Sequence, residues 1–413
     1  MSSKNTADQA FVREVNLSSV LRVIHTEAPL SRAQLAVITG LNKSTVSSLV
    51  EELLARGLIH ETGMNSAGTG RPSTLLEINP QAGHIIGVEL GVDFVSVALT
   101  DFLGNILWRR VVNSDPNEDQ ETTLAKTLDL VHEAIATGRE MSLLLIGLGL
   151  AAPGIVDLDD GVLIFAPNLC WRNVPLRKIF SDQTGLKVFI ENDANAAAIA
   201  EHLFGVARHS KDFIFVFAGV GIGGGLFLNG KLYRGKNGFA GEIGRSPMMA
   251  AGSSNKLQNQ AEDLGYWETY ANQSSIAQRL RTRLELKQKS VNSKLFSEQN
   301  PLPSISVIKQ IADSEDVDMR DAISETGMAL GQGFASLINI FNPEKIILGG
   351  PLSIIGDYLL PSTKDAANHY SLPEIGQQAE VVLSTFGQDA SLIGAIAIVV
   401  DDVLSKPSHI ERR

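Results

Sequence analysis

The chain has one cysteine, Cys170, among its 413 residues. A single thiol excludes an internal disulfide framework and a zinc site built from several cysteines. No apolar run reaches the roughly 20 residues that a membrane-spanning helix needs. The N-terminal sequence MSSKNTADQA also lacks the apolar segment of a secretory signal. These absences predict a cytoplasmic protein with no membrane partner, no bound metal and no other cofactor.

Positive charge is also scarce, since 35 Lys and Arg face 46 Asp and Glu, giving a net charge of −11. Such a balance disfavours nucleic-acid binding when it is spread evenly. It is not even here, because residues 1–80 hold seven of each sign and the remainder holds 28 basic and 39 acidic residues. The excess negative charge therefore lies outside residues 1–80, and it does not argue against DNA binding by the N-terminal part. The length suits two or three domains.

The N-terminal part predicts a helix-turn-helix. Apolar residues recur at helical spacing over residues 17–24. Ser31 can cap a second helix, and Gly40 can end it in a left-handed conformation. Asn42 or Ser44 can then cap a third helix.

The third helix is the expected recognition helix, because its N-terminal part meets base edges in helix-turn-helix proteins. Hydroxyl side chains and a lysine suit bonds to bases and phosphates. Two strand-like segments follow, LIHET and STLLEIN, around a glycine-rich tip that we interpret as a wing. Arg71, stiffened by Pro72, is expected to enter the minor groove. The predicted DNA contacts are Asn42, Lys43, Ser44, Thr45, Ser47, Ser48 and Arg71. The alternative is a small helical bundle that mediates protein contacts.

From residue 84 the pattern changes to alternating strands and helices, twice over. The first series has the strand-like runs HIIGVELGV, VSVALTD and NILWRRVV, a polar helix near 119–138, and the strands LLLIGLGLAAPGIVD and KVFIEND. The second series has FIFVFAGVGIGGGLFLNGKLYRG and KIILGG, and the apolar helix 389–404 follows. Such a series favours two α/β lobes with a cleft between them. We expect the last helix to dock on the first lobe or to contact another subunit.

Four segments carry a family resemblance: GVGIGGGLFLNGKLYRGKNGFAGEIG at 219–244, ENDANAAAIAEHLFG at 191–205, AAPGIVD at 151–157 and IILGGPL at 346–352. With them the chain resembles the ROK family of repressors and sugar kinases, particularly its xylose-repressor-like and NagC/Mlc-like regulators. The resemblance spans nearly the whole chain. It implies an α/β protein with a winged helix-turn-helix fused to a two-lobed actin/hexokinase-like (ribonuclease H-like) domain. The expected domains are 1–80, then 81–192 with 386–413 as the first lobe, and 193–385 as the second lobe.

The resemblance also implies where a sugar binds. Carboxylates accept hydrogen bonds from neighbouring hydroxyls, and asparagine both donates and accepts. Arg245 stands where the family has a histidine, and its planar donors suit a carboxylate or phosphate, so an acidic effector is one expectation. The other is that Arg245 only pairs with Glu242, Glu262 or Asp263. The implied sugar-binding residues are Gly154, Asn168, Asn192, Asp193, Glu242, Arg245 and Glu268.

Phosphoryl transfer would need backbone amides and charged groups around the phosphates. The first phosphate hairpin of family kinases resembles Asp-x-Gly-Gly-Thr-Lys, and here it reads ELGVDF from Glu89 to Phe94. The second loop, normally Gly-Thr-Gly, has Val220 in the middle. These changes predict no kinase activity and no catalytic residue. Asp193, at the position of the family's base, is then a vestigial base, an N-cap for helix 194–204, or a sugar ligand.

The zinc ligands of the family are missing as well, because the residues after Gly244 contain no cysteine. Trp171 is expected in the core, and Cys170 beside it as a small buried hydrophobe. The sequence thus predicts a sugar-responsive DNA-binding regulator, most simply a repressor, acting as a homodimer or homotetramer on operator DNA. The alternative is an ATP-dependent sugar kinase with an accessory DNA-binding domain.

Overall fold

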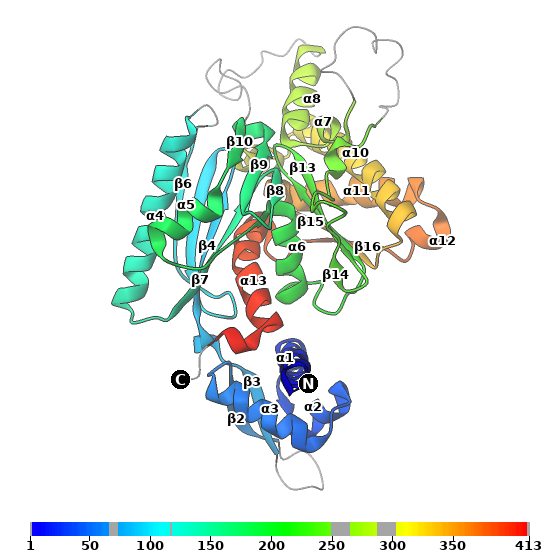
Figure 1. The fold of residues 1–413 in the computed structure, drawn as a ribbon. Coiled ribbons are helices and arrows are strands. Elements are labelled where there is room, and N and C mark those ends of the chain that lie inside the picture. The colour runs from blue at the N-terminus through cyan, green and yellow to red at the C-terminus, as the bar shows by residue number, and fades with distance from the viewer. Residues whose placement is uncertain (1, 66–72, 116–117, 249–264, 287–302, 411–413) are drawn as a thin grey trace.

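The computed structural model of the protein describes residues 2–65, 73–115, 118–248, 265–286 and 303–410. It consists of a small N-terminal module and a larger body built on two five-stranded sheets (Figure 1). Among the described helices, none is long and apolar enough to cross a membrane.

The N-terminal module is a winged helix. Ser31 caps the second helix in a capping box with Gln34, and Gly40 ends it at φ 70°, both as the sequence predicts. The predicted wing tip, including Arg71, lies outside the described residues. The elements are α1 (Ser2–Glu27), β1 (Leu30–Ser31), α2 (Arg32–Thr39), α3 (Lys43–Ala55), β2 (Ile59–Asn65) and β3 (Ser73–Ile78).

The first lobe has a five-stranded sheet in the order β11-β7-β4-β5-β6. Its first three strands are parallel, and β4, β5 and β6 form an antiparallel meander. A separate small sheet has the strand order β10-β9-β8. The elements are β4 (His84–Leu90), β5 (Phe94–Thr100), β6 (Ile106–Asn113), α4 (Gln120–Glu140), β7 (Leu145–Ala152), β8 (Ile155–Asp157), β9 (Val162–Ala166), β10 (Trp171–Val174), α5 (Leu176–Thr184) and β11 (Val188–Asn192).

The second lobe repeats this arrangement, with a sheet in the order β14-β13-β12-β15-β16. Strands β12, β13 and β14 form a meander, and β15 and β16 run parallel to β12. The repeat is the duplicated α/β architecture that the resemblance implies. The elements are α6 (Asp193–Leu203), β12 (Phe213–Ala218), β13 (Ile222–Leu228), β14 (Lys231–Leu232), α7 (Trp267–Tyr270), α8 (Gln273–Leu286), α9 (Ile305–Asp313), α10 (Val317–Phe341), β15 (Lys345–Gly349), α11 (Gly356–Tyr370), α12 (Pro373–Gly376), β16 (Glu380–Leu383) and α13 (Ala390–Ser405).

Helices α6 and α13 pack against each other between the two sheets (Figure 1). Small residues permit the contact: a Cβ on Gly394 would lie 2.3 Å from the carbonyl carbon of Ala196, and one on Gly149 only 1.6 Å from the Ala395 oxygen. The last helix therefore docks on the first-lobe sheet, one of its two expected positions. The domain limits at residues 80 and 192 stay a prediction.

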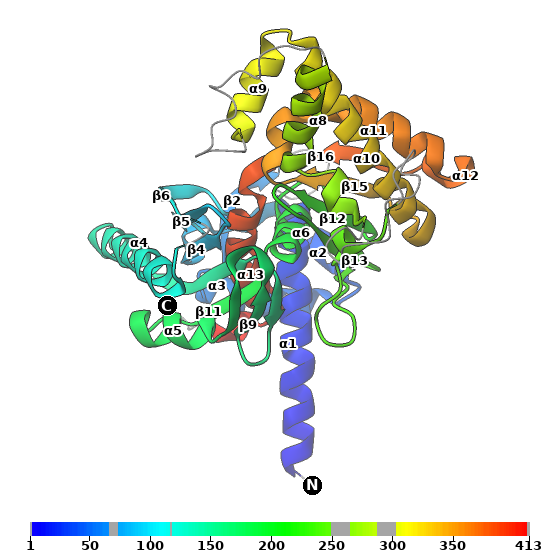
Figure 2. The same ribbon diagram turned by 90° about the horizontal axis from the view of Figure 1, so that it is seen from above.

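Helix α1 joins the winged helix to the body through its contact with α13, and its N-terminal end projects away from the body (Figure 2). Leu17, Leu21 and Ile24 of α1 share one apolar core with Ile396 and Val400 of α13. Because this core is continuous, the winged helix packs directly against the body and is not an independent domain on a linker.

Polar bonds surround the shared core. The Arg22 guanidinium donates to Asp401 at 2.8 Å, and the Ser18 hydroxyl donates to the Leu404 carbonyl at 2.7 Å. Arg56, which follows α3, donates to the Ser408 carbonyl at 3.1 Å. The winged helix therefore contacts the C-terminal segment at several points.

Candidate functional site

A cavity of about 500 Å³ lies between the two lobes. Its size is that of a small-molecule site. It is lined by Glu89, Leu90, Gly91, Val92, Asp93, Phe94, Pro153, Gly154, Ile155, Phe165, Pro167, Asn168, Asn192, Asp193, Phe217, Val220, Gly221, Ile222, Gly223, Glu242, Arg245, Glu268 and Pro351. All seven residues expected to contact a sugar are in this set, and they come from five separate segments of the chain.

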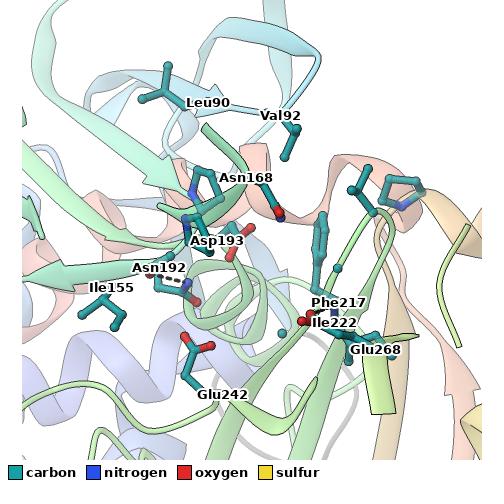
Figure 3. A pocket seen from close by; sticks show the side chains of 18 of the residues that line it. Leu90, Val92, Ile155, Asn168, Asn192, Asp193, Phe217, Ile222, Glu242 and Glu268 are labelled. Atoms are coloured by element: carbon teal, nitrogen blue, oxygen red, sulfur yellow. Dashed lines mark hydrogen bonds between the residues drawn. The ribbon is translucent and has the colours of Figure 1, made fainter. Parts of the chain in front are cut away.

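Asn192 and Asp193 lie where β11 passes into α6 (Figure 3). Asn192 is the N-cap, because its side-chain oxygen accepts from the backbone N–H groups of Ala194 at 3.0 Å and Asn195 at 3.1 Å. The interpretation of Asp193 as the N-cap is therefore wrong. It is the first residue of the helix, and its Oδ1 accepts from the N–H of Ala194 at 2.8 Å.

The electrostatics of Asp193 are unusual for a carboxylate at a helix N-terminus. Burial raises its pKa to about 7, opposed by the Ala194 N–H and reinforced by the nearby Glu242. Burial also raises the pKa of Glu242. The positive charge of Arg245 opposes this shift, and the nearby Glu268 adds to it. Both carboxyl groups line the cavity, where they can accept hydrogen bonds from sugar hydroxyls.

Arg245 pairs with Glu268, with 3.1 Å between Nε and Oε1. Its guanidinium also lies 5.2 Å from the centre of the Tyr266 ring. Arg245 was expected to pair with Glu242, Glu262 or Asp263, and it pairs with Glu268 instead. Glu262 and Asp263 lie outside the described residues. The other Glu268 oxygen accepts weakly from the Ile222 N–H at 3.4 Å. Glu268 therefore joins α7 both to Arg245 and to the start of β13.

Gly154 also lines the cavity, next to Asn192. Its φ is 92°, and a Cβ there would lie 2.2 Å from the carbonyl oxygen of Phe165, so only glycine fits. Its own carbonyl accepts from the Asn192 amide at 3.0 Å. Asn168 is exposed on a 3₁₀ turn, and its amide nitrogen would be 3.7 Å from a Cβ on Gly221. These positions leave polar groups facing the cavity from both lobes.

Two buried acidic residues near the cavity were not predicted as part of the site. Glu89 is buried in β4, and burial raises its pKa to about 8, with Asp193 and Asp389 adding to the effect. Glu191 accepts from the Asn192 N–H at 3.0 Å and pairs with Arg234. A charged residue inside an otherwise apolar strand was the available signal for both.

The predicted DNA-contacting residues lie at the start of α3. Lys43, Ser44 and Ser48 are exposed, whereas Thr45 and Ser47 are half-buried. The Asn42 side-chain oxygen is engaged in capping, because it accepts from the Thr45 N–H at 2.8 Å and the Ser44 hydroxyl at 2.7 Å. Arg71 lies outside the described residues.

Trp171 is buried, as expected, but the prediction for Cys170 is wrong. Cys170 is exposed. It ends a 3₁₀ turn in a left-handed conformation with φ 55°, and this geometry turns its side chain out of the core. No cluster of three or more potential metal ligands occurs among the described residues.

Comparison with known proteins matches both parts of the chain. The model of the ROK family matches residues 85–402, and that of the MarR family matches residues 18–67. The "Xylose repressor" of Caldicellulosiruptor bescii is 31% identical over 97% of this chain and 99% of its own length.

A glucokinase of Halalkalibacterium halodurans is 30% identical over 75% of this chain and 92% of its own length. Among solved structures, a ROK family transcriptional regulator, a homologue of the Escherichia coli MLC protein, superimposes with a TM-score of 0.77. Its identity is 27%, over 96% of this chain and 97% of that chain. The match to the regulator includes the winged helix, whereas the match to the kinase covers only three quarters of the chain.

Proposed function

This chain belongs to the ROK family, and we propose that it is a sugar-responsive DNA-binding transcription regulator that represses genes of carbohydrate metabolism. One observation carries the proposal. Helix α13 contributes to the core of the winged helix, and at its other end the Ser391 hydroxyl donates to the Asp193 carbonyl at 3.2 Å. The DNA-binding module and the cleft thus share a structural element.

On the DNA side, α3 presents Lys43, Ser44 and Ser48 to solvent. We propose that these residues, with Thr45, Ser47 and Arg71, contact the operator, and that Asn42 orients them by capping. A homodimer, or a tetramer built from dimers, would read half-sites one helical turn apart or at multiples of that spacing.

On the sugar side, we propose that Asn168, Asn192, Asp193, Glu242 and Glu268 bind hydroxyl groups, with Gly154 admitting the sugar. A neutral sugar is favoured over an acidic one. Arg245, the one cationic residue among the described residues that line the cavity, is already paired with Glu268. Xylose and N-acetylglucosamine are the first candidates, since relatives named as their repressors align over nearly the whole chain.

The proposed coupling acts through the position of α13. A sugar that draws the lobes together changes the contact of α6 with α13, and α13 carries α1 with it. A coupling free energy of about 1–3 kcal/mol would change operator affinity about 5- to 150-fold.

We propose no phosphoryl transfer. At the first hairpin the Gly91 N–H is held by the Phe94 carbonyl at 2.8 Å, and Val92 and Asp93 occupy the turn. At the second loop Val220 supplies no hydroxyl. The Asp93 carboxylate would repel a phosphate.

The test is a fluorescence-anisotropy titration of DNA from upstream of the protein's own gene, at stated salt, with and without a panel of neutral and acidic sugars. We expect tight, salt-sensitive binding that one neutral sugar shifts. Absence of binding at low salt, on a fragment shown to contain the operator, would reject the regulator. Unshifted binding would reject a sugar effector within the panel. ATP-dependent sugar turnover that is lost in Asp193→Asn would establish the kinase instead.

A further inference from the structure

The cavity has a polar part and an apolar part. The polar part is formed by the amide and carboxyl side chains already described. The apolar part is formed by Leu90, Val92, Phe94, Phe217, Val220 and Pro351. In the view of Figure 3, Leu90 and Val92 lie at one end and Asn192 and Glu242 at the other, with Asp193 between them.

One wall of the apolar part is the β4–β5 hairpin. The Phe94 ring lies over the turn, because a Cβ on Gly91 would be 2.5 Å from its Cε1 atom. The N–H of Gly91 is meanwhile bonded within the hairpin. The hairpin therefore presents the Leu90, Val92 and Phe94 side chains to the cavity, together with the Asp93 carboxyl in the turn. Because the Gly91 N–H is already bonded, it has no hydrogen to offer an anion.

The opposite wall comes from the second lobe. A Cβ on Gly219 would lie 3.0 Å from Cδ of Pro351 and 3.5 Å from Cε1 of Phe217, so the ring and the proline flank this loop. The N–H of Gly219 donates to the Gly221 carbonyl at 3.0 Å. Val220 is 40% exposed. One N–H group on each wall, that of Gly91 and that of Gly219, is thus already engaged by the protein.

The charges exclude an anionic occupant for this part. Among the described residues that line the cavity, Arg245 is the one cation, and it is paired with Glu268, whereas the Asp93 carboxyl lies in the β4–β5 turn beside the apolar part. Phosphate, sulfate or carboxylate groups would meet repulsion without a compensating donor. Apolar surface has no such penalty, and its burial is favourable.

We propose that the cleft binds a sugar carrying an apolar alkyl or aryl substituent, such as a glycoside, with the substituent held between the two hairpins. This inference rests on the proposed function, since the sugar ring occupies the polar part. The cavity of about 500 Å³ has room for both groups.

The test is isothermal titration calorimetry of the full chain. The ligands are xylose, glucose and N-acetylglucosamine, their hexyl and phenyl glycosides in both anomeric forms, 6-O-hexanoyl glucose, and ATP. We expect at least one substituted sugar to bind about tenfold or more tightly than its parent, since burying roughly 55 Å² of apolar surface suffices for that gain. Its binding heat capacity should be more negative than that of the parent.

Variants locate the effect. Phe94→Ala should remove most of the gain and leave the affinity of the parent sugar within about twofold. Val92→Ser, in the partly exposed turn, should also remove most of the gain and leave the affinity of the parent sugar within about twofold. It keeps the test valid if Phe94→Ala fails to fold. Ile340→Ala is the control, because Ile340 is 70% exposed on α10 and does not line the cavity.

The possible outcomes separate the two proposals. Parent sugars that bind as tightly as every substituted form would overturn this inference and leave the sugar-responsive regulator intact. A gain that Phe94→Ala and Val92→Ser leave unchanged would also overturn it. Binding of ATP in competition with the sugar would replace the apolar group with a nucleotide. If no sugar binds, substituted or not, both proposals fail.

Discussion

Arg22 of α1 and Asp401 of α13 form an ion pair at 2.8 Å, which connects the DNA-binding module to the helix behind the cleft. Both side chains are partly exposed, so the pair adds at most about 1 kcal/mol to folding. Its position matters more, because it lies in the contact through which α13 is proposed to carry α1.

Arg22→Ala should therefore reduce the effect of the sugar on operator affinity more than it reduces DNA binding itself. The measurement is anisotropy with and without effector. Lys178→Ala, which removes an exposed pair with Asp182 on α5, is the matched control. A double-mutant cycle with Asp401→Ala isolates the pair. Full sugar response in Arg22→Ala would contradict coupling through this contact.

Arg71→Ala should weaken operator binding by about 1–3 kcal/mol and flatten its salt dependence, without unfolding the protein. The reason is the proposed entry of the guanidinium into the minor groove. Anisotropy at several salt concentrations measures both effects. Arg139→Ala, at an exposed position on α4, is the control. Unaltered affinity would eliminate the wing contact.

Glu89 gives a prediction about pH. Its pKa is raised from 4.5 to about 8, so the folded state holds a proton that the unfolded state has lost between those values. The stabilising effect of that proton is fully present below pH 4.5 and disappears as pH rises through 8. Glu89→Gln should therefore become more stable than the wild type as pH rises, by about 2–4 kcal/mol at pH 8.5, since one pKa unit corresponds to about 1.4 kcal/mol.

Denaturant unfolding at pH 5 and pH 8.5 measures that difference. Glu315→Gln, at an exposed site before α10, is the control. An equal stability difference at both pH values would show that Glu89 is ionised in the folded protein.

Arg245 distinguishes neutral from acidic effectors. With the guanidinium engaged by Glu268, the wild type should show no preference for an acidic sugar over its neutral parent. Arg245→Ala should lower neutral-sugar affinity by about tenfold or less, through loss of the orientation of Glu268. Calorimetry with paired sugars and sugar acids measures this. Selective, Arg245-dependent binding of the acid would revive the acidic effector.

The kinase alternative is tested by product formation. The wild type should give no sugar phosphate with ATP and magnesium, and Asp193→Asn should match its background rate. The altered hairpin at Val92, Asp93 and Phe94 is the reason. A sugar-dependent rate that falls in Asp193→Asn would refute the proposal.

Local signals in the sequence were sufficient for much of the fold. Ser31, Gly40 and Asn42 act through bonds or dihedral angles within four residues, so their roles as helix caps and stops were predictable. The length of α1 was not, because its apolar periodicity begins at Leu17 whereas the helix begins at Ser2. Residues upstream of the contact with the core carry no burial pattern to read.

The site was harder to predict from the sequence than the fold, because its details depend on tertiary contacts. The resemblance indicated which residues would line the cleft, but Arg245 and Glu268 are far apart in sequence, and nothing local predicted their pairing. Asn192 and Asp193 are both good caps, and only the extended conformation of Asn192 decides between them. Cys170 is turned outward by a left-handed residue that hydropathy does not reveal.

The apolar core common to α1 and α13 also limits how this protein can be divided. Cutting the chain after residue 80 would divide this core, so that α13 would lose the cover of α1 and the released fragment would lose the cover over Leu17 and Leu21. Neither piece would be expected to stay soluble. A chimera that exchanges DNA specificity between relatives must therefore transfer α13 together with the winged helix, or redesign the interface between α1 and α13.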